Sequence, residues 1–245
     1  WPDPGGHLPA AHPYPAALGM SDPHAVGNAS WMANLMTGSM ATLRGRLDAG
    51  LAALGLNPSP DQRDQLIQFI DLLARWNRAY NLTAVREPLE MVSRHLLDSL
   101  AIRPYLLGSP VLDLGTGAGL PGLPLAILDP GSRFVLLDSN GKKIRFVRQA
   151  TMDLGLANVE VIQARMESYR PGEKFATIIT RAVADQETLR LVVKALLASP
   201  GRLLLMKGRR PEEAPVTLTA NNAVIHRLEV PFLDAERHLI EIRQD

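Results

Sequence analysis

Residues 111–122 read Val-Leu-Asp-Leu-Gly-Thr-Gly-Ala-Gly-Leu-Pro-Gly, where a short apolar run breaks into four glycines before the chain turns apolar again at Leu123. The pattern predicts a buried strand, a tight loop and the start of a helix. Glycine suits this loop because a side chain would clash at positive φ or would hold the backbone away from a bound cofactor. Pro121 and Pro124 fit the first turn of the helix, where a missing N–H group costs nothing.

The glycines leave two classes of cofactor open. Residues 117–122 match the dinucleotide fingerprint Gly-x-Gly-x-x-Gly, so a nicotinamide cofactor and S-adenosylmethionine (SAM) are both possible. Asp138 ends the next apolar run and suits a ribose diol in either cofactor. Asp113 discriminates between the two cofactors. A carboxylate just before Gly115 repels the pyrophosphate of a dinucleotide but attracts, directly or through water, the ammonium of a methionine moiety. Its alternative role is to cap backbone amides of its own loop.

Composition narrows the class of protein. The chain has 245 residues, 46% hydrophobic and 21% charged, enough for a globular α/β core with an appendage. It contains no cysteine, which excludes disulfides, thiolate metal sites and the thiolate that methylation at pyrimidine C5 normally needs. A net charge of +1 is compatible with nucleic acid without requiring it. No apolar run approaches the roughly 20 residues that cross a bilayer, so we expect a soluble, cytoplasmic protein with no membrane partner.

The N-terminal stretch differs from the rest of the chain. Residues 1–40 contain six prolines and three of the six histidines, and they contain no lysine or arginine. This composition disfavours regular structure, and it lacks the basic and apolar segments of a secretory signal. Because the chain begins with Trp1 rather than Met, we interpret residues 1–40 as a disordered leader or an engineered end. We predict no metal site from its histidines.

Three stretches with apolar residues at helical spacing follow, over about residues 41–54, 60–79 and 88–102. The second begins with a capping box, in which Ser59 and Gln62 satisfy each other's backbone N–H groups. We expect these helices to form an N-terminal cap, residues 41–103, packed on a main domain, residues 104–245. In the third stretch His95 and Asp98 share one helix face; they could orient a base or grip RNA, but a local hydrogen bond between helices is the commoner use.

After the glycine loop, strands and helices alternate. We expect strands over 133–137, 159–162, 176–179, 202–206, 223–230 and 238–243, and helices after Asn140 and over 185–197. This alternation predicts a parallel sheet, whose ligands bind at the carboxyl ends of the strands. The positions just past those ends are Gly115 to Gly119, Asp138, Met166 with Glu167, Arg181, and Lys207 to Arg210.

Each of these positions has a chemical use. If the cofactor is SAM, Met166 and Glu167 offer its adenine a backbone N–H and a carboxylate acceptor, although they could also form a solvated loop. Arg181 could contact the cofactor carboxylate or a substrate phosphate, or it could pair with Asp185.

A basic cluster follows the strand over 202–206. Lys207, Arg209 and Arg210 could bind backbone phosphates, or they could form a solvated face.

If the cofactor is SAM, the sequence also limits which atom could be methylated. The tetrapeptide Asp/Asn-Pro-Pro-aromatic, typical of methylation at an exocyclic base amine, is absent, and Thr180-Arg181-Ala182 stands in its place. With cysteine missing too, the remaining nucleophiles need little activation. A ring nitrogen with an exposed lone pair, such as guanine N7, is one of them.

An ordered set of motifs supports a resemblance from about residue 43 to the C-terminus. The motifs are Asn81-Leu82-Thr83, Arg94-His95-Leu96-x-Asp98-Ser99, residues 112–122, Leu137-Asp138-Ser139 with Lys142-Lys143, Thr180-Arg181-Ala182 and Met206-Lys207-Gly208. With them the chain resembles the bacterial 16S ribosomal RNA guanine-N7 methyltransferase family, also called glucose-inhibited division protein B. The resemblance implies a class I SAM-dependent methyltransferase fold, which is Rossmann-like α/β with a mostly parallel seven-stranded sheet and an N-terminal helical cap.

The resemblance further implies methyl transfer from SAM to N7 of a guanine in 16S ribosomal RNA, free or in the 30S subunit; we expect a monomer. It assigns cofactor contacts to Gly115, Leu120, Met166, Glu167 and Arg181. The glycine pattern adds Gly117 and Gly119, and the general class I pattern adds Asp138. We expect RNA contacts from Lys207, Arg209 and Arg210. No catalytic residue is assigned, and Arg181 is the candidate for positioning.

Two alternatives stay open at this point. The first is a nicotinamide-dependent oxidoreductase, which the pattern Gly-x-Gly-x-x-Gly alone permits. The second is an RNA-binding or ribosome-assembly factor without enzymatic activity, whose cofactor pocket is vestigial.

Overall fold

The protein is described by a computed structural model that covers the backbone of residues 26–181, 186–208 and 223–244 and, within these, the side chains of residues 40–181, 187–208 and 223–244. The predictions that concern residues 1–25, Asp185, Arg209 and Arg210 therefore lie outside the described residues. In the described part, no helix is long and apolar enough to cross a membrane.

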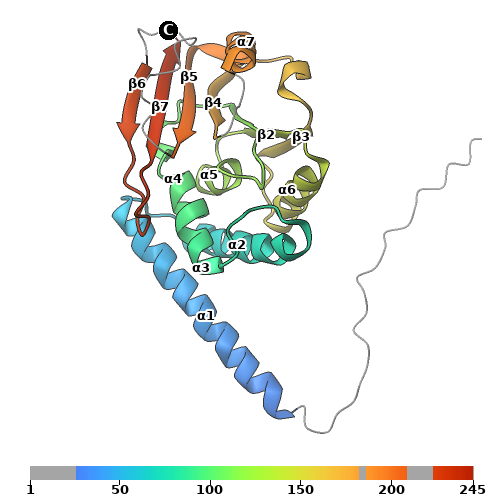
Figure 1. Ribbon diagram of the computed structural model, residues 1–245, viewed down its shortest axis with the longest axis vertical. Helices are drawn as coiled ribbons and strands as arrows, with labels where there is room; N and C mark the ends of the chain where they lie inside the picture. The colour runs from blue at the N-terminus through green and yellow to red at the C-terminus, as the bar shows by residue number, and fades with distance from the viewer. Residues whose placement is uncertain (1–25, 182–185, 209–222, 245) are drawn as a thin grey trace, which may run out of the picture. The chain divides into compact units, whose positions relative to one another are not determined.

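One seven-stranded sheet has the strand order β3-β2-β1-β4-β5-β7-β6 (Figure 1). The strands are β1 Val111–Leu114, β2 Phe134–Asp138, β3 Val159–Gln163, β4 Phe175–Thr180, β5 Leu197–Lys207, β6 Ala223–Arg227 and β7 His238–Gln244. Strands β1 to β5 run parallel, and β7 is antiparallel to both β5 and β6. The mostly parallel seven-stranded sheet is thus confirmed. The strand order reverses between β1 and β4, which is where such sheets bind their ligands.

Helices cover both faces of this sheet (Figure 1). On one face lie α2 Pro60–Tyr80, α5 Gly122–Leu128 and α6 Gly141–Asp153, and on the other lies α7 Gln186–Leu196. Alternate residues of β1 serve the two faces, since Val111 belongs to the core under α5 and α6 whereas Leu112 and Leu114 belong to the core under α7. Burial on both faces explains why the strand is apolar at every position except Asp113.

The N-terminal helices are joined to the main domain by a shared core. The capping box of α2 is confirmed, because Gln62 N–H donates to Ser59 Oγ at 3.2 Å and Ser59 N–H donates to Gln62 Oε1 at 2.9 Å. Gln62 Nε2 also donates to Ile127 O of α5 at 2.8 Å, and Gln65 Nε2 donates to Leu154 O after α6 at 2.9 Å. Helix α2 therefore packs on the α5–α6 layer, as expected of a cap.

The first helix is longer than expected. Helix α1 spans Val26–Ala53, whereas the sequence pattern placed its start near residue 41. Leu43, Leu47 and Leu51 are buried as their helical spacing predicts. The prediction that residues 1–40 disfavour regular structure was wrong for residues 26–40, because proline, which breaks helices, is confined to residues before Val26 in this stretch.

The third helical stretch is confirmed but is not uniform. It consists of α3 Pro88–Met91, a π-helical segment η1 Val92–Leu97 and α4 Asp98–Leu100, followed by the 3₁₀ turn η2 Arg103–Tyr105. A second 3₁₀ turn, η3 Met166–Ser168, follows β3. π-helical segments are rare inside helices and often occur at functional sites.

Candidate functional site

The glycine turn follows β1 at the carboxyl edge of the sheet. Gly115, Gly117 and Gly119 have φ angles of 72°, 60° and 77°, in the left-handed region that favours glycine. A Cβ added to Gly117 would meet its nearest neighbour, Lys143 Nζ, at 3.9 Å, which is an ordinary van der Waals contact. A Cβ added to Gly119 would instead clash with the side chain of Leu123. Gly119 is therefore needed for packing, whereas at Gly117 it is the positive φ that favours glycine.

Asp113 is a buried carboxylate at the base of this turn, only 1% exposed. Its Oδ2 accepts hydrogen bonds from Thr116 Oγ1 at 2.7 Å and from Gly122 N–H at 2.9 Å. Its Oδ1 is buried without a hydrogen-bond partner among the described residues. Burial raises the pKa of Asp113 to about 6, although Thr116 and the nearby Arg181 act to lower it. A buried polar atom without a partner is costly, so Oδ1 is suited to a ligand that donates to it.

The hydrogen-bond donors and acceptors at this turn, both those with a partner and those without one, fit SAM better than a dinucleotide. In dinucleotide-binding folds, N–H groups at the start of the first helix bind the pyrophosphate. Here the N–H of Gly122, at the start of α5, already donates to Asp113, whose charge would repel phosphate. The ammonium of a methionine moiety is the kind of donor that a carboxylate oxygen attracts. Both roles considered for Asp113 are therefore compatible, since one oxygen caps the loop and the other is free.

Asp138 ends β2 beside the same turn. Gly117 N–H donates to its Oδ2 at 2.9 Å, and Asn140 N–H donates to its Oδ1 at 2.8 Å. A carboxylate has about four lone-pair sites, so these two bonds orient the group and leave acceptor capacity for ribose hydroxyls. The fold thus brings the predicted ribose acceptor to the glycine turn.

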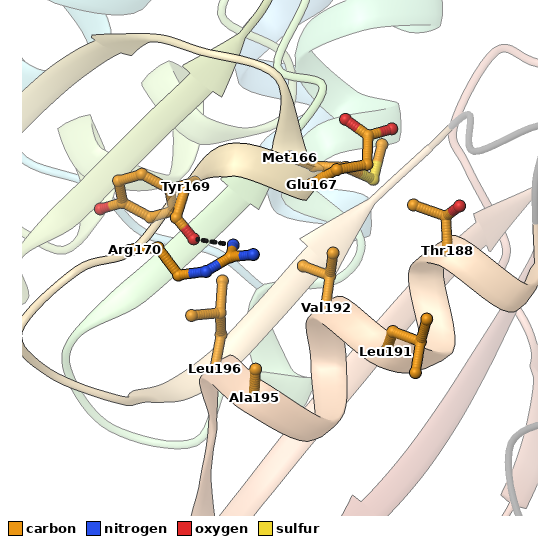
Figure 2. Close-up of a pocket in the computed structure, with 9 residues that line it drawn as sticks. All are labelled: Met166, Glu167, Tyr169, Arg170, Thr188, Leu191, Val192, Ala195 and Leu196. Carbon is orange, nitrogen blue, oxygen red and sulfur yellow. Dashed lines mark hydrogen bonds between the residues drawn. The ribbon is translucent and has the colours of Figure 1, made fainter.

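Met166 and Glu167 lie on η3, at one end of a cavity of about 280 Å³ (Figure 2). Helix α7 contributes apolar side chains to this cavity, among them Leu191, Val192 and Leu196. In Figure 2 the carboxylate of Glu167 points away from these side chains of α7. An apolar surface next to an exposed carboxylate is what a flat heteroaromatic ring with an exocyclic amine requires.

Leu120 and Arg181 occupy contrasting environments. Leu120 is 2% exposed in the core, and its N–H donates to Thr116 O at 2.9 Å, so the fold itself uses both its side chain and its N–H.

Arg181 follows β4, its side chain is 28% exposed, and one guanidinium nitrogen lies 3.8 Å from Asp98 Oδ2. Burial lowers the pKa of Arg181, and the attraction of Asp98 and Asp113 opposes this. Arg181 is thus electrostatically coupled to two carboxylates, Asp98 and Asp113.

A second cavity, of about 200 Å³, lies at the carboxyl ends of β4 and β5. Its lining includes Asp98, Arg181, Met206, Lys207, Leu228 and Arg237. Lys207, a predicted RNA contact, therefore lies beside Arg181, whereas Arg209 and Arg210 lie in the part of the chain that the structure does not describe.

The side chains of His95 and Asp98 do not bond to each other. His95 Nδ1 lies 3.0 Å from Arg94 O, which can only accept, so Nδ1 carries the proton and Nε2 accepts from Thr83 Oγ1 at 2.9 Å. Burial, aided by the charge of Arg181, lowers the pKa of His95 to about 4, so the ring is neutral at pH 7. His95 therefore makes the local bond that fixes its helix. Asp98 is different, because its Oδ1 accepts from Arg237 Nε at 2.8 Å.

Arg237 is the functional candidate that sequence reasoning missed. It lies 139 positions after Asp98, in the segment between β6 and β7. No local pattern marks an arginine in a loop, and a contact across that separation exists only once the sheet has formed. The only sequence signal was the polarity of Asp98 within an apolar helix face, which indicated that a partner was needed.

The chain is similar in sequence to known proteins that share one description. A family model described as rRNA small subunit methyltransferase G matches residues 62–240. The ribosomal RNA small subunit methyltransferase G of Methylococcus capsulatus is 52% identical over 198 residues, covering 80% of this chain and 97% of the relative. The protein of the same name from Yersinia enterocolitica is 45% identical over 203 residues, covering 82% of this chain and 98% of the relative. The one from Marinobacter nauticus is 50% identical over 198 residues, covering 80% and 92%.

Proposed function

This chain belongs to the rRNA small subunit methyltransferase G family, and from that premise we propose that it methylates N7 of a guanine in 16S ribosomal RNA. It is a SAM-dependent rRNA methyltransferase with the class I fold. The observation that supports SAM as the methyl donor is the buried Asp113 at the glycine turn, and the absence of any cysteine supports a target atom that needs no thiolate, such as guanine N7. We further propose that it acts as a cytoplasmic monomer, in which residues 41–103 cap a methyltransferase domain over residues 104–245.

The proposed reaction asks little covalent chemistry of the protein. SAM supplies a methyl group activated by its sulfonium. The N7 lone pair of guanine forms the new C–N bond as the C–S bond breaks, the electron pair of that bond goes to sulfur, and the positive charge passes to the guanine ring. No proton is removed from N7, so no general base is required, which agrees with a neutral and hydrogen-bonded His95. The chain contributes alignment of the two reactants.

The residues proposed to hold SAM lie along one edge of the sheet. Gly115, Gly117 and Gly119 form the turn, Asp113 accepts the ammonium and Asp138 accepts the ribose. Met166 and Glu167 hold the adenine, with α7 as the apolar wall, and Arg181 positions the reactants. For Leu120 only its carbonyl oxygen is left to contact the cofactor, since its side chain and N–H are occupied.

The decisive experiment is transfer of labelled methyl from SAM. Purified protein is incubated with unmodified 30S subunits and, separately, with 16S ribosomal RNA extracted from them, and the product is mapped by nuclease digestion. We expect 7-methylguanosine at one position in at least one substrate. Normal SAM binding with methyl transfer to neither substrate would contradict the proposal and favour a binding or assembly role. Reduction of a nicotinamide cofactor is not expected.

Gly117→Ala tests whether the turn itself holds SAM. The left-handed φ of 60° makes any Cβ unfavourable by about 1 to 2 kcal/mol. Gly155→Ala is the matched control, because Gly155 has φ 65° and open space around it but lies after α6, away from the turn. We expect both variants to lose similar stability in urea denaturation. Only Gly117→Ala should lose SAM affinity, by about tenfold or more in calorimetry. Equal affinities in the two variants would show that the turn does not bind SAM.

Lys207→Gln tests the RNA surface. If Lys207 contacts a phosphate, its loss should weaken RNA binding whatever the sequence and reduce the slope of log K against log salt by about 1. Lys174→Gln is the control, because this exposed lysine directly precedes β4, at the opposite end of that strand. Filter binding between about 50 and 200 mM salt measures both slopes. An unchanged slope for Lys207→Gln would place the lysine outside the RNA interface.

A further inference from the structure

The cavity beside Arg181 contains a carboxylate that the cofactor site does not use. The side chain of Asp98 is 7% exposed, and Arg237 Nε donates to its Oδ1 at 2.8 Å. Its Oδ2 lies 3.8 Å from the guanidinium of Arg181 and makes no hydrogen bond within the described part of the chain. Asp98 therefore lines the cavity with one oxygen held by Arg237 and a second oxygen that accepts no hydrogen bond from the described residues.

This cavity is next to the glycine turn. Leu114 pairs with Thr180, and Thr180 pairs with Leu205, so the residues that follow them, Gly115, Arg181 and Met206, come side by side at the carboxyl edge of the sheet. The cavity volume of about 200 Å³ is below the roughly 300 to 1,000 Å³ of sites for drug-sized ligands, and it suits a single nucleobase. A base placed here would be one strand away from the proposed methyl donor.

Guanine has the complementary pattern of groups. Along one rim it presents the N2 amine, N1–H, O6 and N7, which are two donors followed by two acceptors. Arg181 follows β4, which lies between β1 and β5, and it lines the cavity together with Asp98. Along the carboxyl edge of the sheet the cavity therefore comes first, then Arg181, and then the glycine turn. A carboxylate matches the two donors, and a guanidinium matches O6. N7 then comes nearest to the glycine turn.

Adenine has the wrong pattern for the same site. Its N1 is an acceptor, and a lone pair facing a carboxylate oxygen is repelled, so Asp98 would reject the base that most resembles guanine. A site that hydrogen-bonds the polar edge of its substrate discriminates strongly against an analogue that lacks those polar groups. This discrimination is stronger than that of an apolar pocket against a substrate that lacks one methylene.

We propose that Asp98 selects guanine as the target base by accepting hydrogen bonds from N1–H and the N2 amine at Oδ2, while Arg237 holds Asp98 in place. The proposal rests on the proposed function, because it presupposes a guanine substrate. The local structure supports it, since Asp98 directly follows the π-helical segment η1 and begins α4, so the helix geometry changes at the residue that carries this role. Arg237 is a positioning residue and does not contact the base.

The first test uses the wild-type enzyme and altered RNA. The mapped target position carries guanosine, inosine or adenosine, where inosine lacks the N2 amine but keeps N1–H, O6 and N7. We expect kcat/KM to fall about tenfold with inosine, and by about 100-fold or more with adenosine. Equal rates with guanosine and inosine would overturn the role of Asp98 while leaving the proposed function intact. Failure to methylate the guanosine substrate would contradict the proposed function, and it would contradict the role of Asp98 as well.

The second test asks whether the discrimination depends on Asp98. In Asp98→Asn the ratio of kcat/KM for guanosine over inosine should approach 1, and Arg237→Gln should lower the same ratio with rescue by Arg237→Lys. Glu241→Gln is the control, since Glu241 is a 1% exposed carboxylate in β7 that also has arginine partners, away from the cavity. It should keep the wild-type ratio even if stability falls. An unchanged ratio in Asp98→Asn would overturn the proposal. If that variant does not fold, the comparison of guanosine with inosine in the wild-type enzyme still tests the proposal.

Discussion

Asp113→Asn is expected to weaken SAM binding 10- to 100-fold and to make the cofactor-free protein more stable above pH 6. Asparagine keeps an oxygen for the two bonds that Oδ2 accepts from Thr116 and Gly122, so the loop geometry should survive. It removes the negative charge that Oδ1 offers to an ammonium. The lost affinity corresponds to about 1.4 to 2.7 kcal/mol, the range for a hydrogen bond to a charged group.

The gain in stability follows from the pKa of Asp113. The folded protein binds this proton up to about pH 6, whereas the unfolded chain releases it near 3.8. Between these values the folded state holds more protons than the unfolded state, so the free energy of unfolding falls as pH rises. The difference in pKa corresponds to a loss on the order of 3 kcal/mol, complete above pH 6. The asparagine variant has no proton to lose at this position and avoids the penalty.

Urea denaturation at pH 4 and pH 8 measures this effect as a difference between wild type and variant. Calorimetry supplies the second measurement, because wild-type affinity for SAM should decrease below pH 6, where Asp113 becomes protonated, whereas the affinity of the variant should not depend on that group. A variant that binds SAM as tightly as wild type would show that Asp113 only caps its own loop.

Arg181→Ala is expected to reduce kcat/KM for methyl transfer by about 100-fold or more while lowering stability by about 1 kcal/mol. The effect on activity is large because the charge of Arg181 lowers the pKa of both Asp113 and Asp98, so its loss raises the pKa of both carboxyls and removes the group proposed to position the reactants. The effect on stability is small because its contact with Asp98 is long, at 3.8 Å, and Asp98 keeps its hydrogen bond from Arg237.

Arg202→Ala is the matched control for this experiment. Arg202 lies in β5, its side chain is 27% exposed compared with 28% for Arg181, and its Nε lies 3.3 Å from the buried Glu241. It also donates to Tyr105 O at 3.1 Å, away from the glycine turn. Arg202→Ala should lower stability as much as Arg181→Ala does, or more. At a temperature where both variants are folded, its kcat/KM should change little. Parallel losses of melting temperature and activity in the two variants would show that Arg181 is structural.

Much of the fold could be predicted because its signals are local. The capping box at Ser59 and Gln62 involves neighbours in sequence, and it fixed the start of α2 correctly. The start of α1 was placed too late, because composition over 40 residues was dominated by the prolines before Val26. The mostly parallel order followed from the alternation of strands and helices, but the antiparallel pairing of β7 with β5 and β6 was not predicted and is known only from the structure.

The sequence by itself determined the cofactor turn, since positive φ at Gly117 and the carboxylates Asp113 and Asp138 are set by residues close to the ends of β1 and β2. Only the tertiary structure decided which oxygen of Asp113 is left without a partner and that Arg237 holds Asp98 from 139 positions away. The physical reason is that backbone conformation and strand ends depend on neighbours along the chain, whereas burial and charge pairing depend on segments that meet only after the sheet has assembled.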